Sequence, residues 1–461
     1  LKQDILTPIP PMIMRVLMEF GVYIPFLKVE ISLSATSIQV CMLFKKNNPL
    51  KYPFLLIFIL LILTTSCEDT TLVPEIKFKG ELMEIMTFGG SQEDIGFDII
   101  ETQDGGLAVI GNTKSVNGTV TDKTVEVSDY WLLRFDSQME LLWSYTYGGS
   151  DDDRGQSVIE TADGGFVLAG YSKSSDNDAS KNQGQHDNWM LKVDAFGNFL
   201  WEKSFGYSGH DHAYTIISTQ DGGLLMTGFI DVTASGGKGN IAKGSSFHGV
   251  GEFWTHKFDA LGNVQWRRYF GGTSNDRSYD AVEANDGGFV ITGTTESTDV
   301  DVTSNQGEYD VWVLKLNAEG TLQWAKIYGG SGIDGSNGIL KTDDGSYLLV
   351  GNTFSNNGAV SLNYGASDVW VLSINDQGNL LWEKTYGGSE FDLGRGITAG
   401  PDNTVFIVGN SKSKDNYVLQ NQGENDAWVF QIDTTNGKLL WEHSFGGSGI
   451  SISLINPNKS V

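Results

Sequence analysis

The sequence predicts an all-β protein, a β-propeller with six four-stranded blades. A unit of about 58 residues recurs from near residue 80 to the end of the chain, and its opening glycine returns at intervals of 59, 58, 65, 58, 58 and 59 residues. Tryptophan falls twice in each unit, so six units hold all 12 tryptophans. A fixed period of this length is typical of propellers and other repeat arrays. The opening glycines are Gly89, Gly148, Gly206, Gly271, Gly329, Gly387 and Gly446.

Each unit contains four short stretches rich in aliphatic or aromatic residues, which predict strands a, b, c and d of one blade. In the second unit these stretches are Ser157–Thr161, Phe166–Tyr171, Asn188–Val193 and Asn198–Phe205. Asp-Gly pairs join a to b in five units, because this pair tolerates the positive φ of a tight hairpin turn. Short glycine-containing segments join c to d. The b–c and d–a connections are therefore expected together at the opposite edge, where they form a more elaborate face.

The two ends of the repeat region bear on how the ring closes. Residues 80–88 align with strand d, and residues 450–455 align with strand a. Radial sheets bury their faces against their neighbours, so a closed ring is favoured over an open arc. Six complete blades with two extra terminal strands is the simplest interpretation. An incomplete seventh blade stays open, since a truncated or frame-shifted gene for seven blades would give the same pattern.

Residues 42–67 are interpreted as a secretory signal. Basic residues precede an unbroken apolar run, Phe54–Leu63, which is too short to span a bilayer. Small residues then lead to Cys67, and this arrangement resembles the lipobox of bacterial lipoproteins, although Thr64 stands where the common pattern has leucine. The resemblance implies cleavage before Cys67 and attachment of a lipid anchor to its thiol.

The other boundaries follow from that signal. We interpret residues 1–41 as an upstream or non-native extension, with a membrane-associated stretch as the alternative, residues 68–79 as a polar tether and residues 80–461 as the propeller. The chain has two cysteines, Cys41 and Cys67, and both precede the repeats. The folded body is therefore expected to contain no disulfide and no cysteine-based metal site.

The formal net charge of the chain is −26. A surface this acidic repels nucleic acid and anionic lipid headgroups, and it attracts cations or basic partners. A role in solubility is the simpler interpretation of the charge. We expect no nucleic-acid partner, contact with the membrane through the lipid anchor alone, and a monomer.

One carboxylate recurs in every blade, within the pattern Gly-Gly-Ser/Thr-x-x-Asp and its variants. If these aspartates faced the axis, their like charges would raise some of their pKa values or recruit a cation. The favoured alternative is that each aspartate accepts backbone N–H bonds and braces its own turn, because repetition in every blade is typical of a fold requirement. These residues are Asp94, Asp153, Asp211, Asp276, Asp334 and Asp392.

The b–c loop carries Asn-x-Gly-x-x-Asp-x-Trp in four units, and in two of them oxygen-bearing side chains extend the pattern upstream. Alternating oxygen ligands with a glycine at the bend are typical of calcium loops. The spacing resembles the calcium loops of integrin-type propellers, but with an extra residue before the closing aspartate and a hydroxyl in place of a carboxylate. An Asx-rich turn is the favoured alternative. We therefore expect no cofactor, and calcium is the one candidate. The candidate ligands are Asp178, Asn182, Asp187, Asp301, Asn305 and Asp310.

The third unit breaks the repeat, since its b–c loop is the longest. Function is often carried by such loops, so Lys238, Lys243 and His248 are candidates for partner binding. A neutral insertion is the alternative.

Two histidines in the same unit, His210 and His212, flank Asp211 and are candidates for a pair of metal ligands. They fall in a degenerate turn, with Gly206-Tyr207 where other units have Gly-Gly, and this favours an ordinary turn. No Ser-His-Asp order, phosphate loop or dinucleotide fingerprint stands out.

The order of Asp-x-Trp, a hydrophobic strand, Gly-Asn-Leu-Leu-Trp and Gly-Gly-Ser resembles the tandem propeller repeats of bacterial surface lipoproteins, and more distantly quinoprotein-like propellers, over residues 80–455. The resemblance implies a lipid-anchored, non-catalytic binding or scaffold module for a protein or a glycan at the bacterial outer membrane, facing the periplasm or the surface. The alternative is a carbohydrate-active or quinone-dependent enzyme, since propellers host many functions. An enzyme should break the repeat at several inward positions, whereas one clear break in the third unit favours binding.

Overall fold

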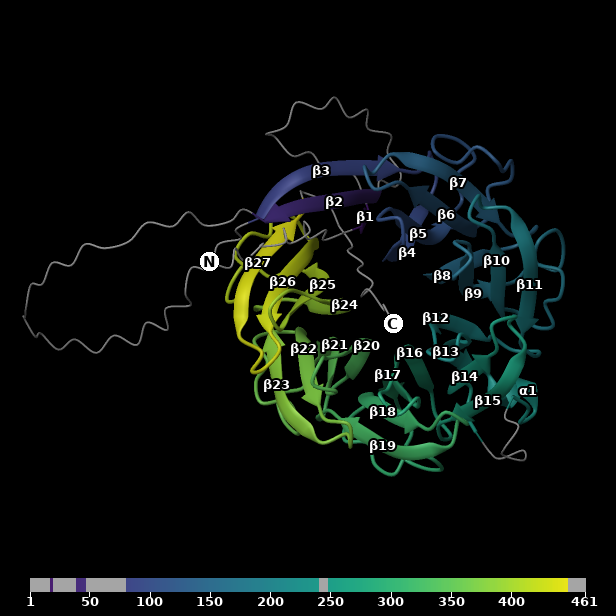
Figure 1. The fold of residues 1–461 in the computed structure, drawn as a ribbon. Coiled ribbons are helices and arrows are strands. Elements are labelled where there is room, and N and C mark those ends of the chain that lie inside the picture. The colour runs from purple at the N-terminus through teal and green to yellow at the C-terminus, as the bar shows by residue number, and fades with distance from the viewer. Residues whose placement is uncertain (1–16, 20–38, 47–79, 240–247, 447–461) are drawn as a thin grey trace, which may run out of the picture.

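The structure is a computed structural model of the chain, and it describes residues 17–19, 39–46, 80–239 and 248–446. Six four-stranded antiparallel sheets stand around a central axis (Figure 1), so the predicted propeller with six four-stranded blades is confirmed. The described residues contain one α-helix, the short α1 (Val232–Ser235) in the long loop of the third unit. No helix in this part of the chain combines the length and the apolar character needed to cross a bilayer.

Within each blade the strands follow sequence order from the inner to the outer edge. Blade 1 contains β4 (Asp94–Glu101), β5 (Leu107–Thr113), β6 (Asp129–Phe135) and β7 (Leu141–Tyr147). Blade 2 contains β8 (Asp153–Glu160), β9 (Phe166–Ser172), β10 (Asp187–Val193) and β11 (Phe199–Phe205). Blade 3 contains β12 (His212–Ser218), β13 (Leu224–Ile230), β14 (Glu252–Phe258) and β15 (Val264–Phe270).

The second half of the ring repeats the same plan. Blade 4 contains β16 (Asp276–Glu283), β17 (Phe289–Thr295), β18 (Asp310–Leu316) and β19 (Leu322–Tyr328). Blade 5 contains β20 (Asp334–Lys341), β21 (Tyr347–Thr353), β22 (Asp368–Ile374) and β23 (Leu380–Tyr386). Blade 6 contains β24 (Asp392–Ala399), β25 (Thr404–Ser411), β26 (Asp426–Asp433) and β27 (Leu439–Phe445). The inner strands of consecutive blades contact one another around the axis.

A three-stranded sheet occupies the ring position between blade 6 and blade 1 (Figure 1). It consists of β1 (Leu17–Glu19), β2 (Gln39–Lys46) and β3 (Gly80–Phe88), and both β1 and β2 contact β4. β3 is the outer strand, as expected of a strand d, and its partners β1 and β2 come from residues upstream of the repeats. β2 overlaps the start of the predicted signal peptide, and cleavage of that peptide would remove β1 and β2 from the ring. The strand expected at residues 450–455 lies outside the described residues.

Strand a begins earlier than the sequence predicted. In blade 2 we expected Ser157–Thr161, but β8 runs from Asp153 to Glu160 and has a bulge between Gly155 and Ser157. The first residues of the strand are polar or glycine, since the buried Asp153 accepts hydrogen bonds from Gly149 and Ser174, and Gln156 lines the axial cavity. The N–H of Asp153 donates to Ser128 O at 2.6 Å, and this bond pairs the strand start with the preceding blade.

The apolar core lies between neighbouring blades. One cluster joins Leu348 and Val371 of blade 5 to Ile407 and Phe430 of blade 6, and similar clusters fill the other junctions. The tryptophan of each strand c is at most 1% exposed. The strand-d tryptophans of blades 1 to 5 reach the next blade, as where Trp324 Nε1 donates to the carbonyl of Asp376 at 3.1 Å, whereas Trp441 bonds to Gln431 within blade 6. The paired tryptophans therefore bind each blade to its neighbour.

The hairpin turns have the backbone that their sequences predict. Gly164 in the a–b turn of blade 2 has φ of 76°, a value that glycine adopts without strain. Blade 6 lacks this glycine, and Asp402 and Asn403 take positive φ values of 55° and 56° in its place. Asparagine and aspartate tolerate this region better than other side chains.

Candidate functional site

The recurring aspartates are brace residues. All six are 0% exposed, and each accepts an N–H bond at 2.7–2.8 Å from the residue four positions earlier. In five blades the carboxylate also accepts bonds from two hydroxyl side chains at the end of strand b, as Asp334 does from Thr353 and Ser355. Asp211 differs, since it accepts the N–H of Asp231 at 2.9 Å. These contacts are those expected of the turn-bracing alternative.

A second buried acid lies beside five of the six braces, at the start of strand c in the preceding blade, and Asp94 is the exception among the described residues. A Cβ on Gly387 would lie 2.3 Å from Asp368 Oδ1 and 2.5 Å from Asp392 Oδ2, which explains why glycine stands between the two carboxylates. Burial, reinforced by the charge of Asp392, raises the pKa of Asp368 to about 7. In the same way burial raises the pKa of Asp310 to about 6, next to Asp334. Both acids therefore take up a proton at a higher pH than an ordinary aspartate does.

The calcium candidates in blade 2 make local backbone contacts. Asn182 Nδ2 donates to the carbonyl of Ser172 at 3.0 Å, and its Oδ1 accepts the N–H of Gly184 at 2.8 Å. Asp187 Oδ2 accepts the N–H of Gln183 at 2.7 Å, and Asp178 Oδ2 accepts the N–H of Gly148 at 3.3 Å.

The blade 4 candidates repeat this pattern. Asn305 Oδ1 accepts from Gly307 at 3.1 Å, Asp310 Oδ2 accepts from Gln306 at 2.7 Å, and Asp301 Oδ2 accepts from Gly271 at 3.4 Å. The Asx-rich turn is therefore present in both loops, and calcium binding stays a prediction.

The long loop of the third unit is only partly described. Lys238 is exposed, while Lys243 lies outside the described residues. The side chain of His248 is buried, and its Nδ1 lies 3.1 Å from Glu252 Oε2. His248 thus belongs to the base of the loop, and a direct contact with a partner would require the loop to open. Cys67, the predicted lipid site, also lies outside the described residues.

The axial channel holds a small cavity of about 100 Å³. It is lined by residues at the bulges of the inner strands, including Asp98, Tyr279, Asp280 and Arg395. Burial lowers the pKa of Arg395, and the neighbouring Tyr279 opposes this shift. The carboxylates bond to the inner strand of the next blade, since Asp98 Oδ2 accepts the N–H of Val158 and Asp280 Oδ2 accepts the N–H of Ile339, both at 3.0 Å.

One pair of exposed positions differs from blade to blade on the loop-bearing face. In five blades the residue before the brace faces the residue after strand b, and their main chains are hydrogen bonded, whereas in blade 3 the N–H of Asp231 bonds to the Asp211 carboxylate. In blade 1 this pair is an ion pair, Glu93 with Lys114 at 2.6 Å. In blade 5 it is apolar, Ile333 with Phe354.

Blade 6 extends the apolar character of blade 5. Phe391 lies before its brace, with Lys412 Nζ 5.9 Å from the ring centroid, and the rings of Phe354 and Phe391 are 6.1 Å apart. Ile333, Phe354 and Phe391 are 39%, 39% and 43% exposed, and we call them the apolar patch. A hollow of about 460 Å³ lies beside it, lined by Lys412, Lys414, Glu390, Glu424 and neighbouring residues.

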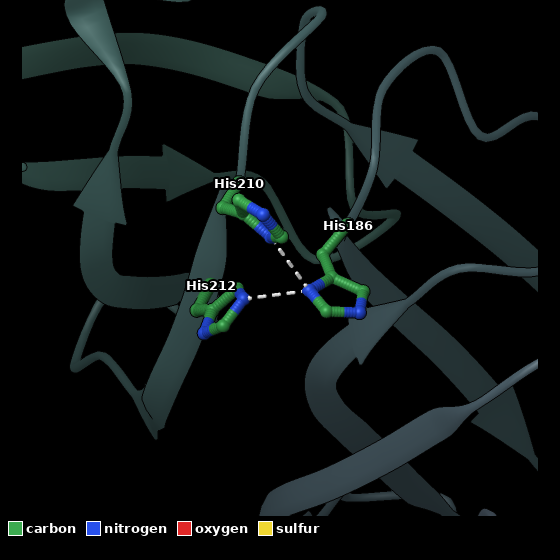
Figure 2. A group of neighbouring side chains, drawn as sticks. All are labelled: His186, His210 and His212. Atoms are coloured by element: carbon green, nitrogen blue, oxygen red, sulfur yellow. Dashed lines mark hydrogen bonds between the residues drawn. The ribbon is translucent and has the colours of Figure 1, made fainter. Parts of the chain in front are cut away.

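The histidines of the degenerate turn meet a third histidine that sequence reasoning did not connect to them. His186 of blade 2 lies against His210 and His212 of blade 3 (Figure 2), and one ring nitrogen of each lies within 4.8 Å of the others. The position of His186 within the repeat could have indicated this contact. His186 directly precedes the Asp-x-Trp motif, and residues at this position pair with the residue before the next brace. The apolar patch was also missed; aligning the six units shows that these positions are apolar in blades 5 and 6, but not that they lie together.

No protein-family model matches the chain. It is 26% identical over 360 residues to a protein of Caulobacter vibrioides named regulatory protein FlaEY, in an alignment that covers 69% of this chain and 36% of that protein. The chain thus spans little more than a third of the length of this relative.

Among solved structures, similarity is distant. The WD40 domain of Neurospora crassa Pan2 aligns with a TM-score of 0.44 at 10% identity, covering 78% of this chain and 82% of that one. The quinohemoprotein alcohol dehydrogenase ADHIIG of Pseudomonas putida HK5 aligns with a TM-score of 0.40 at 11% identity, covering 79% and 69%. A Bacteroides caccae protein of unknown function aligns with a TM-score of 0.39 at 13% identity, covering 70% and 94%. The neighbours therefore include a quinoprotein, as the sequence resemblance implied.

Proposed function

We propose that the chain is a non-catalytic binding or scaffold module of the bacterial envelope, tethered by a lipid on Cys67, and that its apolar patch engages a protein. The observation that carries this proposal is the exposure of Ile333, Phe354 and Phe391 at positions that form an ion pair in blade 1. Exposed aromatic side chains that cluster on a rigid surface are typical anchors of protein interfaces. The recurring polar side chains, in contrast, are buried within the turns.

Charge indicates the kind of protein partner. With a net charge of −26, the chain attracts basic surfaces and repels acidic ones. The hollow beside the patch carries both signs, since Lys412 and Lys414 line it together with Glu390 and Glu424. The favoured partner is therefore a basic protein that inserts apolar side chains at the patch. The similarity to a protein named as regulatory accords with a binding role.

Replacing Phe354 and Phe391 together by serine is expected to lower partner recovery at least about tenfold, since loss of central anchors costs about 2 kcal/mol or more. A photo-crosslinking residue is placed at position 333 of both the wild-type protein and the double variant. Light then activates it in the native cells to capture the bound partner. The wild-type protein should yield one discrete adduct that protease digests, and the double variant should not.

Phe196→Ser is the matched control, because Phe196 is 74% exposed but lies in a c–d turn at the other edge of the blades. It should leave the adduct unchanged, and all variants should keep the wild-type melting temperature. An adduct that a glycosidase removes would instead identify a glycan partner. An adduct equally strong in the double variant would contradict a role for the patch.

The lipid anchor has a separate test. Cys67→Ser should abolish incorporation of labelled palmitate and release the protein from the membrane fraction, because the thioether-linked lipid is the proposed attachment. Cys41→Ser is the matched control and should have no effect. Unchanged labelling of the Cys67 variant would contradict the lipobox interpretation.

A further inference from the structure

Three imidazoles from two blades converge at one point of the loop-bearing face. His186 ends the b–c loop of blade 2, His210 lies in the d–a turn, and His212 begins β12 of blade 3 (Figure 2). His186 Nδ1 lies 2.9 Å from His210 Nδ1 and 3.1 Å from His212 Nε2. The three side chains therefore point at a shared centre.

The main chain fixes this convergence. His186 and His210 form a parallel β-bridge between the blades, and the N–H of Asp211 donates to the carbonyl of His186 at 2.8 Å. The same bridge joins Tyr309 to Ile333 and Ser367 to Phe391 at other junctions, without any histidine. The scaffold is thus general, while the cluster of imidazoles is particular to the junction of blades 2 and 3.

The valence of imidazole makes the arrangement difficult to explain by hydrogen bonds alone. A neutral imidazole nitrogen carries either one lone pair or one N–H, so it makes one good hydrogen bond. His186 Nδ1 nevertheless has two close nitrogen neighbours, at 2.9 and 3.1 Å. A single cation bound by all three lone pairs would satisfy both contacts at once.

The distances suit a transition-metal ion. Zinc binds histidine nitrogen at about 2.0–2.1 Å, so two such ligands in a tetrahedral site lie about 3.3–3.4 Å apart. The two closest nitrogen pairs need to separate by only a few tenths of an ångström to reach this spacing. Imidazole ligands suit zinc, copper and nickel, whereas calcium and magnesium prefer oxygen.

We propose that His186 Nδ1, His210 Nδ1 and His212 Nε2 bind one divalent transition-metal ion, of which Zn²⁺ is the representative case. Three protein ligands leave a coordination position for water or for a donor from a partner. His210 is exposed while His186 and His212 are partly buried, so the open position faces solvent on the loop-bearing face. The ion would also link blade 2 to blade 3.

The residues around the three histidines orient the imidazoles and set the local charge. Tyr171 stacks on His212 with ring centroids 3.8 Å apart and fixes its orientation. Arg154, Lys173 and Arg277 oppose a cation here, whereas the carboxylate of Asp152 favours one.

The test is zinc binding by the purified full chain. After removal of metal with a chelator, titration with Zn²⁺ should show one saturable site, raise the melting temperature, and leave one equivalent of zinc bound after dialysis. His210→Ala should weaken this binding at least about tenfold, because it removes one of three ligands. Since His210 is exposed, the metal-free variant should melt within about 2 °C of the wild type.

Glu93→Ala is the matched control, because Glu93 is the exposed residue before the brace in blade 1. It should keep the wild-type affinity, which separates the histidine site from general attraction of cations to an acidic surface. Co²⁺ should give the visible absorption of a four-coordinate ion in the wild type and in Glu93→Ala, but not in His210→Ala. Absence of saturable zinc binding, or equal binding by His210→Ala, would overturn the proposal.

Discussion

Replacing Asp334 by alanine is expected to lower the urea midpoint of unfolding strongly, with a loss of about 3 kcal/mol or more. The carboxylate is 0% exposed and accepts the N–H of Gly330 at 2.7 Å together with the hydroxyls of Thr353 and Ser355. Alanine leaves these three buried donors without an acceptor, and each such donor costs about 1–3 kcal/mol. Tryptophan fluorescence follows the transition, since the indoles lie between blades.

Asp343→Ala is the matched control, because Asp343 is an exposed carboxylate of the same blade. Its effect should stay within about 0.5 kcal/mol. Asp334→Asn keeps one acceptor oxygen and should fall between the two. If Asp334→Ala left the midpoint unchanged, the brace would contribute little, and a ligand-binding role for the recurring aspartates would regain weight.

The protein is expected to be more stable at pH 5.5 than at pH 8. Burial raises the pKa values of seven carboxyl groups to about 6 or about 7. Such groups bind protons in the folded chain that the unfolded chain releases, so their stabilising contribution is complete below the unfolded pKa and is lost as the pH rises through 6 to 7. They are Asp129, Asp187, Asp211, Asp276, Asp310, Asp368 and Glu442.

Two other sets of groups oppose the gain in stability at low pH, and they set the pH below which the stability falls again. Four histidines, His186, His212, His256 and His443, have lowered pKa values, so the unfolded chain takes up their protons first as the pH falls below 6.5. Lysine partners lower the pKa values of Asp163 and Asp221 to about 2, and that stabilisation is lost only below about pH 4. Because seven carboxyl groups favour the folded chain at low pH and only four histidines oppose it, the free energy of unfolding should be largest between about pH 4 and 6. Each net proton contributes about 1.4 kcal/mol per pH unit.

Asp368→Asn isolates one of these groups. Asp368 Oδ2 accepts the N–H of Tyr364 at 2.6 Å, while Oδ1 has no hydrogen-bond partner among the described residues. The amide keeps the first contact and carries no charge beside Asp392, so the variant should be more stable than the wild type at pH 8 by about 1–3 kcal/mol. Urea unfolding in metal-free buffer at pH 5.5 and pH 8 measures the change.

The free energy of unfolding of Asp368→Asn should also depend less on pH, because the folded variant binds up to one proton fewer than the wild type. Asp343→Asn should follow the wild-type curve. A wild-type midpoint that rises from pH 5.5 to pH 8 would contradict the assigned direction of the carboxyl shifts.

Much of the fold could be predicted because each blade repeats the same local instructions. Asp-Gly turns, paired tryptophans and alternating short apolar stretches predicted the hairpins and the four-stranded sheets, and the structure has them. The start of strand a was less accessible, since Asp153, Arg154 and Gln156 lack the apolar character of a buried strand. Their strand conformation comes from pairing with β9, where Asp153 lies opposite Ser172 and Arg154 opposite Tyr171, and from the bulge after Gly155. A local apolar pattern does not record this pairing.

The candidate sites show the same division. His210 and His212 are visible as a pair in the sequence, but His186 lies 24 residues before His210 and joins them only through the bridge between blades. Ile333, Phe354 and Phe391 are likewise scattered along the chain, and only the ring brings them onto one surface. Lys238 and His248, singled out because their loop breaks the repeat, have different environments, one exposed and one buried.

By itself the sequence determined the architecture, because turn chemistry and burial of indoles act within one blade or between consecutive blades and recur six times. The tertiary structure decided which acids are buried beside one another, which histidines share a centre, and what occupies the seventh position of the ring. These properties depend on distances between residues of different sheets, and such distances are fixed only when the blades pack around a common axis.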